Sequence, residues 1–163
     1  MSLDVKQFRE YIVRPALQAI GLWSEAAEEL VTGTAMVEST LNYVKQLGGG
    51  PAVGVCEEEP ATYLDNKDRI KNKYPRIYAK VLTVLNMQEL PIDASFLMGN
   101  LTASVIFCRL KYYLHPDPLP TAHDYVALAA YHKKIYNTSL GHTDISRSTN
   151  IFKSVVMGYP YKG

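Results

Sequence analysis

The sequence predicts a mostly α-helical fold in a single domain that spans residues 1–163 and contains at most a small β element. Three observations lead to this prediction. Apolar residues recur with the ~3.6-residue period of helices along most of the chain. Prolines and glycines separate these segments, and only residues 52–56 suit a short strand. A length of 163 residues is enough for one compact core and leaves little room for a second.

In the first part of the chain, two periodic segments predict helices. Apolar side chains from Val5 to Ile20 follow the helical period, and Pro15 is expected to kink or split that pattern. Ser24 is typical of a helix N-cap, because its hydroxyl can accept a hydrogen bond from a free backbone N–H. The helix that it opens is expected to end near Glu38.

The second part of the chain is also predicted to be helical. Pro60 and Pro75 are typical of the first turn of a helix, where the missing N–H costs nothing. The longest helix is expected over Asp93–Leu114, and its broad apolar faces indicate a central position. A further helix is expected over residues 122–136, and a last one is expected to stop at Gly158.

Charge and composition exclude several classes of protein. Apolar residues make up 47%, which argues against a disordered chain. The net charge of +1 disfavours a strongly basic nucleic-acid binder, so no nucleic acid is expected as a partner. The charge is unevenly distributed, since residues 1–59 carry nine acids and four bases, and residues 60–163 carry seven acids and thirteen bases.

Other sequence features limit the compartment and the chemistry. No signal peptide is recognised at the N-terminus, and no apolar run is long enough for a membrane span. Cys56 and Cys108 are expected to be free, partly buried thiols. The four histidines lack the spacing of a helical zinc site, so no metal is expected.

Glu38 is the first candidate catalytic residue. A carboxylate at the C-terminal end of a helix faces the negative pole of the macrodipole. The neighbouring Met36 and Val37 indicate partial desolvation. Both effects raise a carboxyl pKa, as a general acid near neutral pH requires. The alternative is an ordinary exposed glutamate at a helix end.

The residues after Glu38-Ser39 form a motif. A glycine-rich run is followed at residues 51–62 by Pro-Ala-Val-Gly-Val-Cys-Glu-Glu-Glu-Pro-Ala-Thr. This order resembles the lysozyme-like superfamily, in its lytic transglycosylase and goose-type lysozyme branch, where Glu-Ser ends a helix and Gly-Ala-x-Gly-Leu-Met-Gln-x-x-Pro-Ala-Thr follows. The positions that match in register are Ala52, Gly54, Pro60, Ala61 and Thr62. Residues 128–131, Leu-Ala-Ala-Tyr, look like the family's later Ala-Ala-Tyr-Asn-Ala-Gly segment.

The chain is more closely similar to lysozyme-like proteins of tailed bacteriophages. Their run Gln-x-Gly-Gly-Gly-Pro-Ala-x-Gly corresponds to residues 46–54, and their segment Tyr-x-Lys-x-x-Tyr-Asn-Thr corresponds to residues 131–138. The resemblance implies a phage muramidase or lytic transglycosylase that cleaves peptidoglycan without a cofactor. Glu38 would protonate the glycosidic oxygen between muramic acid and glucosamine. The substrate-binding candidates are Ser39, Gly54, Tyr131, Tyr136 and Asn137.

Glu57 departs from the family pattern, which has glutamine at this position. An ionised glutamate only accepts hydrogen bonds, whereas glutamine also donates them. One interpretation makes Glu57 a second catalytic carboxylate, which raises the pKa of Glu38 or positions a water. Another is a cleft that has lost its substrate, in a catalytically inactive structural component of a virion. Residues 57–59 are also compatible with a solvated acidic turn.

The same resemblance implies the partners and the location. The expected partner is the glycan strand of peptidoglycan, with other virion proteins as further partners. Without a signal peptide, the protein is expected to be made in the host cytoplasm and then to be virion-associated or delivered to the cell wall.

Overall fold

The computed structural model describes residues 2–136 and 144–158, and these residues are mostly α-helical, as predicted. The short strand expected at residues 52–56 is reduced to isolated bridges from Val53 to Lys45 and to Glu58. The reason is a turn at Gly54, whose φ of +82° takes the chain out of the extended conformation. The β element is therefore smaller than a regular strand pair.

The N-terminal helical segment runs across Pro15 without a loop. Its three pieces are α1 (Val5–Phe8), the π-helix η1 (Arg9–Val13) and α2 (Arg14–Ala19). Proline removes a backbone donor and clashes with the preceding turn. Here the widened π-turn absorbs that conflict, since the N–H of Arg14 donates to the carbonyl of Arg9, five residues earlier. The expected kink at Pro15 thus takes the form of a π-turn.

Helix α3 (Glu25–Glu38) begins and ends where the sequence predicts. The Ser24 hydroxyl accepts a hydrogen bond from the N–H of Ala27 at 3.1 Å. Residues 27–37 are all buried, and such an all-round burial is typical of a central helix. Directly after the helix, Thr40 and Leu41 adopt positive φ values of 52° and 57°. These two residues turn the chain sharply away from the helix axis.

A short 3-10 turn, η2 (Leu47–Gly49), lies in the connection that follows, and two helices begin at prolines, as predicted. They are α4 (Pro60–Lys73) and α5 (Pro75–Leu85). The single long helix expected over residues 93–114 is wrong, because the chain forms the 3-10 helix η3 (Ala94–Met98) and then α6 (Leu101–Tyr113). The side chain of Asn100 accepts a hydrogen bond from the N–H of Ala103, so a new N-cap interrupts the apolar period.

Two more helices complete the described part of the chain, α7 (Tyr125–Tyr136) and α8 (Ile145–Met157). Helix α7 begins three residues later than expected, since the Asp124 carboxylate accepts a hydrogen bond from the N–H of Ala127 at 3.1 Å. Gly158 ends α8 with a φ of 72°, as predicted from the preference for glycine after a helix.

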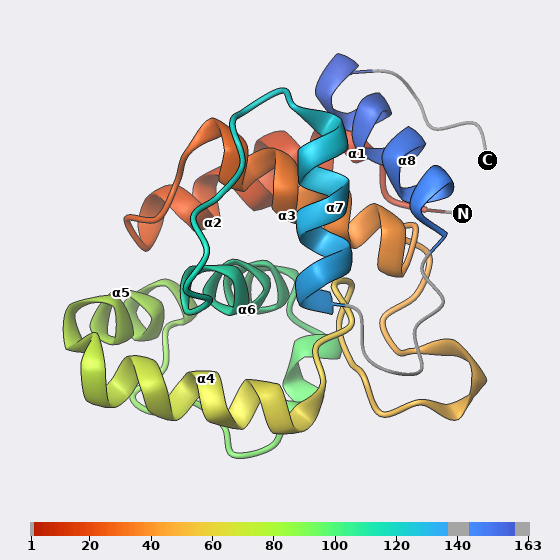
Figure 1. Ribbon diagram of the computed structural model, residues 1–163. Coiled ribbons are helices and arrows are strands. Elements are labelled where there is room, and N and C mark those ends of the chain that lie inside the picture. The colour runs from red at the N-terminus through yellow and green to blue at the C-terminus, as the bar shows by residue number, and fades with distance from the viewer. Residues whose placement is uncertain (1, 137–143, 159–163) are drawn as a thin grey trace.

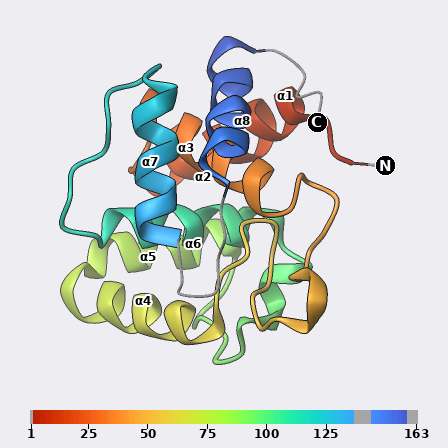
Figure 2. The ribbon, with the colours of Figure 1, turned by 45° about the vertical axis from the view of Figure 1, so that its right-hand side comes forward.

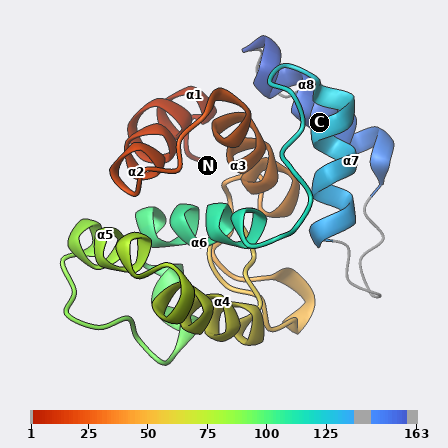
Figure 3. The ribbon, with the colours of Figure 1, turned by 60° about the vertical axis from the view of Figure 1, so that its left-hand side comes forward.

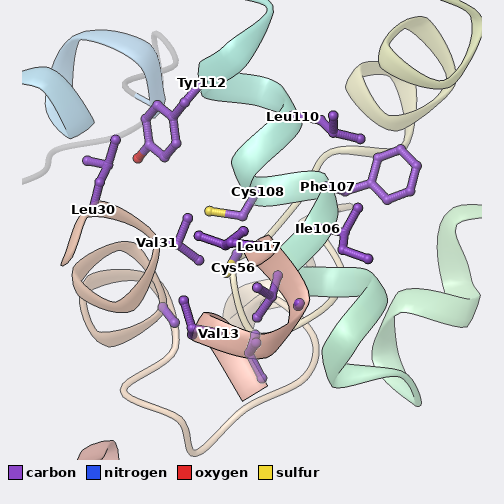
Figure 4. Packing of buried hydrophobic residues seen from close by; sticks show 14 of the residues in the cluster. Val13, Leu17, Leu30, Val31, Cys56, Ile106, Phe107, Cys108, Leu110 and Tyr112 are labelled. Atoms are coloured by element: carbon purple, nitrogen blue, oxygen red, sulfur yellow. The ribbon is translucent and has the colours of Figure 1, made fainter. Parts of the chain in front are cut away.

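Helix α6 runs between two groups of helices (Figures 1 and 2). Helices α4 and α5 lie on one side, and α1 to α3 with α7 and α8 lie on the other, as Figure 3 also shows. Buried apolar side chains from both groups meet α6 in one hydrophobic cluster. Part of this cluster, with Cys56 and Cys108, appears in Figure 4. Both cysteines are free thiols, as predicted, but they are fully rather than partly buried, because they lie in the centre of the cluster.

Helices α3 and α8 approach each other closely at Gly33. A Cβ atom built on Gly33 would lie only 2.1 Å from a ring carbon of Phe152, so no larger residue fits there. This contact holds α8 against α3. None of the helices in residues 2–136 and 144–158 is long and apolar enough to cross a membrane.

Candidate active site

A cleft of about 350 Å³ opens beside the end of α3, between the connection that follows this helix and the first turn of α8. Its lining combines two carboxyl side chains, one arginine, and several apolar or neutral polar groups. The lining residues are Val37, Glu38, Ser39, Thr40, Tyr43, Gln46, Leu47, Glu57 and Arg147. Glu38 and Glu57, which are nineteen positions apart in the sequence, therefore share one cleft.

Glu38 is the last residue of α3, and its side chain is 19% exposed. Its Oε1 atom lies 2.8 Å from Nε2 of His132, which comes from α7 and is fully buried. The His132 ring also stacks on Tyr136, with the ring centroids 5.1 Å apart. The carboxyl of Glu38 is thus held by a fixed ring on one side and is open to the cleft on the other.

Glu57 faces Glu38 from the turn that begins at Gly54. The turn is closed by a backbone hydrogen bond from the N–H of Glu57 to the carbonyl of Gly54 at 3.0 Å. Burial raises the pKa of Glu57 to about 8, and the charge of Glu38 and a hydrogen bond with it add to this rise. The cleft therefore contains a carboxyl group that keeps its proton near neutral pH.

Glu57 also has a φ of 49°, in the left-handed region that non-glycine residues seldom adopt. Thr40, which also has a positive φ, lines the same cleft, and Leu41 with its positive φ follows it in the chain. Two of the five non-glycine residues with positive φ among the described residues, Thr40 and Glu57, thus line the cleft that holds the two carboxyl groups. Residues held in such conformations are concentrated at functional sites, where the surrounding structure imposes them.

The acidic run at residues 57–59 is not a solvated turn. Glu58 is buried, and among the described residues neither of its carboxyl oxygens has a hydrogen-bond partner. Burial raises its pKa to about 7, against the opposing influence of Lys111 and Asn66. The first of the two interpretations of Glu57, a second carboxylate in the cleft, agrees with its position, and its catalytic role stays a prediction.

Ser39 is buried, and its position suits a residue that steadies Glu38. Its hydroxyl oxygen lies 2.7 Å from the carbonyl oxygen of Val55 and 3.0 Å from that of Ala35. The same oxygen accepts a hydrogen bond from the N–H of Leu41 at 3.2 Å. Ser39 therefore connects the end of α3 to the segment that carries Glu57, although it is only 1% exposed where it lines the cleft.

Gly54 holds the same segment against α6. Its N–H donates to the carbonyl of Val44 at 2.7 Å. A Cβ atom at this position would lie 2.6 Å from the hydroxyl of Ser104 on α6, and the positive φ adds strain for any other residue. This buried glycine shapes the turn, and it is not among the residues that line the cleft.

The predicted tyrosines are placed behind the cleft rather than on its lining. Tyr131 is 7% exposed, and its hydroxyl donates to the carbonyl of Asp117 at 2.9 Å. Tyr136 stacks on His132, and its hydroxyl donates to the Cys108 sulfur at 3.4 Å. Tyr136 thus contributes through the ring that holds Glu38. Asn137, the other candidate, lies outside the described residues.

Sequence reasoning assigned no role to His132 and Arg147, whose side chains contact the end of α3. His132 follows Tyr131 in the late segment that resembles the phage proteins, and this proximity was the only local signal. Arg147 donates from Nη1 to the carbonyl of Val37 at 3.3 Å, where a positive charge is favourable at the end of α3. Its contact with α3 joins positions 110 residues apart, so no local pattern indicates it.

Within residues 2–136 and 144–158, no three histidine, cysteine, aspartate or glutamate side chains are grouped closely enough to hold a metal ion. Comparison with protein-family models, with curated proteins and with solved structures finds no match for the chain. The resemblance to the lysozyme-like superfamily therefore rests on the sequence motifs and stays a prediction. What the structure adds is a cleft with two facing carboxyl groups, an arrangement suited to general acid–base chemistry.

Proposed function

We propose that the protein cleaves the glycan strand of peptidoglycan, as a phage muramidase or lytic transglycosylase. One observation carries the proposal: Glu38 at the end of α3 faces Glu57 in an open cleft, and the pair holds a proton near neutral pH. Glycosidic bond cleavage needs a carboxylic acid that is still protonated at the working pH. The motifs around Glu38 and residues 51–62 supply the choice of substrate.

In this proposal the carboxyl pair performs both proton transfers. It first protonates the glycosidic oxygen, so that the bond to the sugar breaks and positive charge develops at the anomeric carbon. The remaining negative charge of the pair stabilises that centre. The attacking oxygen, from water in a hydrolase or from the sugar's own hydroxyl in a transglycosylase, then returns its proton to the pair. No further cofactor enters this sequence of steps.

The test is the release of muropeptides from purified peptidoglycan, measured by mass spectrometry. We expect release by the unmutated protein, and a loss of about 100-fold or more in Glu38→Gln, the range that removal of a general acid–base group gives. Glu89→Gln is the matched control, since this side chain is 77% exposed and is not part of the cleft. Anhydro products identify a transglycosylase, and reducing ends identify a hydrolase.

A catalytically inactive virion component is the second candidate, favoured by a separate observation. Tyr43, Val44 and Leu47 expose 44%, 45% and 63% of their surface on the connection beside the cleft. Neighbouring exposed apolar residues are typical of protein interfaces. Under this alternative the cleft is a remnant, and the unmutated protein releases no muropeptides at any pH or protein concentration. That result would overturn the proposed enzymatic activity.

A further inference from the structure

Glu38 lies between two side chains, one that stabilises its ionised form and one that destabilises it. His132 approaches from α7 with Nε2 at 2.8 Å, and Glu57 approaches from the turn after Gly54. Only the carboxyl group that carries the shared proton can act as the general acid. The resemblance implies that the donor is Glu38, whereas the contacts around the pair allow the question to be answered from this chain itself.

The hydrogen bonding of His132 identifies its tautomer. Nδ1 of this ring is buried and has no hydrogen-bond partner among the described residues. A buried N–H without an acceptor is rarer in proteins than an acceptor without a donor. The proton of the neutral ring is therefore on Nε2, and Nε2–H donates to Oε1 of Glu38. A doubly protonated ring is disfavoured for the same reason, because its Nδ1–H would be unpaired.

A hydrogen bond from a fixed donor favours the ionised form of a carboxyl group. Glu38 receives such a bond from His132. The carboxyl of Glu57 has no donor among the described residues, and its one hydrogen-bonding neighbour is Glu38 itself. Burial of Glu57 acts in the same direction, since it disfavours the charged form. When one proton is shared by the two groups, it belongs on Glu57.

We propose that Glu57 is the residue that donates the proton to the glycosidic oxygen, and that His132 is a positioning residue which keeps Glu38 ionised beside it. The inference rests on the proposed function and reverses the role that the resemblance gives to Glu38. Glu57 transfers its proton as the bond between the glycosidic oxygen and the anomeric carbon breaks. The carboxylate of Glu38 stabilises the positive charge, and Glu57 recovers its proton from the attacking water or sugar hydroxyl.

Charged groups on each neighbouring element agree with this assignment. Glu38 comes from α3, His132 from α7, and Arg147 from α8. Arg147 is the single basic residue among the described residues that line this cleft, and it forms no ion pair with a described acidic side chain. Its positive charge is compatible with one ionised carboxyl in the cleft. Tyr43 and Gln46, from the connection after α3, add no charge near neutral pH.

The first experiment measures muropeptide release against pH for three proteins. We expect Glu57→Gln to lose activity about 100-fold or more at every pH, with Glu89→Gln unchanged. The unmutated protein should lose activity as the pH rises through about 8, where Glu57 gives up its proton. A Glu57→Gln protein that keeps or gains activity would overturn the inference, and it would mean that Glu57 had weakened an inherited site.

The role of His132 is tested by two replacements with different hydrogen bonding. His132→Phe keeps a flat ring against Tyr136 but removes the donor to Glu38. We expect the acid limb of its activity profile to move to higher pH, with a smaller effect on KM, because a hydrogen bond that favours the charged form of a carboxyl group is lost. His132→Gln keeps an N–H donor and should return the limb toward that of the unmutated protein. An unchanged acid limb in folded His132→Phe would contradict the positioning role.

A measurement without substrate separates this inference from the proposed function. Carbon-13 NMR of the glutamate carboxyl groups, with Glu57→Gln and Glu38→Gln used for assignment, reports which carboxyl is protonated at pH 6. We expect the protonated signal to be that of Glu57. If the protein releases no muropeptides but Glu57 carries the proton, the proposed function fails and the proton assignment stands. If Glu38 carries the proton, the inference fails, whatever the activity.

Discussion

The two ends of α3 lie beside glutamates whose pKa values are shifted in opposite directions, Glu28 on the helix itself and Glu57 on the turn that faces its C-terminal end. Near the N-terminal end, Glu28 accepts hydrogen bonds from Arg9 and Arg14, each at 2.6 Å, and from Trp23 at 2.9 Å. Burial alone would raise the pKa of Glu28, but these donors outweigh it and hold the pKa at about 2. At the C-terminal end, the facing pair has far fewer donors, and the pKa of Glu57 rises to about 8.

Burial raises the pKa of both Glu28 and Glu57, so the difference between them comes from the number of hydrogen-bond donors that each carboxyl receives. The π-turn places Arg9 and Arg14, five residues apart, on one face toward Glu28, and the helix dipole is also favourable there. At the other end, the dipole is unfavourable to a carboxylate, and Glu57, from the turn that faces α3, retains a proton near neutral pH. The charge near one end of α3 is thus fully compensated, whereas the carboxyl pair at the other end is available for chemistry.

The largest expected effect on stability is at Glu28, near the N-terminal end of α3. Glu28→Gln should lower the free energy of unfolding by about 3 kcal/mol, because removing one partner of a buried ion pair leaves the other uncompensated. Denaturant unfolding measures this change. Glu25→Gln is the control on the same helix, and as an exposed substitution it should shift the free energy by no more than about 0.5 kcal/mol. Equal effects of the two substitutions would show that the ion pairs of Glu28 with Arg9 and Arg14 do not stabilise the fold.

The second effect appears in the pH dependence of stability. Glu28 has a lowered pKa, so its contribution is present above pH 4.5 and is lost as the pH falls toward 2. Glu57 has a raised pKa, so its contribution is present below pH 4.5 and is lost as the pH rises through about 8. Unfolding of the unmutated protein between pH 2 and pH 9 should therefore show greatest stability near pH 4.5.

Substitution of Glu57 tests the decline in stability that is expected above pH 4.5. Glu57→Gln should become more stable relative to the unmutated protein by about 1 kcal/mol between pH 5 and pH 9, after allowance for the partial exposure of this side chain. Glu58 titrates in the same range, at about 7, but it is present in both proteins and cancels in the difference. A difference that does not change with pH would show that Glu57 is not perturbed.

The smallest expected effects on stability come from the residues that cap the two ends of α3. Ser24→Ala removes the hydrogen bond to the N–H of Ala27 and should cost about 1 kcal/mol. Arg147→Met removes the donor to the carbonyl of Val37 and the favourable charge at that end, and should cost about 0.5 kcal/mol. Thermal unfolding of both variants tests this order, and a larger loss in Arg147→Met would indicate that the C-terminal end is more tightly held than its hydrogen bonds suggest.

Local signals were sufficient to predict much of the helical structure. Ser24, Pro60, Pro75 and Gly158 mark helix ends through their own backbone and side-chain chemistry, and the structure confirms each. The prediction was wrong over residues 93–114, where the apolar period concealed the N-cap at Asn100. A cap residue inside an apolar pattern is a local feature, so this break was recognisable in the sequence.

The site was only partly predictable, because some of its members meet through tertiary contacts. Glu38 and Glu57 follow one motif and lie in one cleft, as the motif implied. His132 lies 94 positions beyond Glu38, and its contact depends on how α7 packs on α3. Tyr131, a substrate-binding candidate from the later segment, instead directs its hydroxyl to the carbonyl of Asp117. Sequence spacing does not specify which face of α7 meets the cleft.

The close approach of Gly33 to Phe152 has a consequence for the evolution of this chain. A side chain at position 33 requires a smaller one at position 152, and loss of the Phe152 ring leaves a cavity that a residue at position 33 can fill. The two positions are 119 apart in the sequence, yet the size of the side chain at one limits the size of the side chain at the other. Because α8 also carries Arg147 to the cleft, substitutions far from the carboxyl pair that shift this helix would alter the site indirectly.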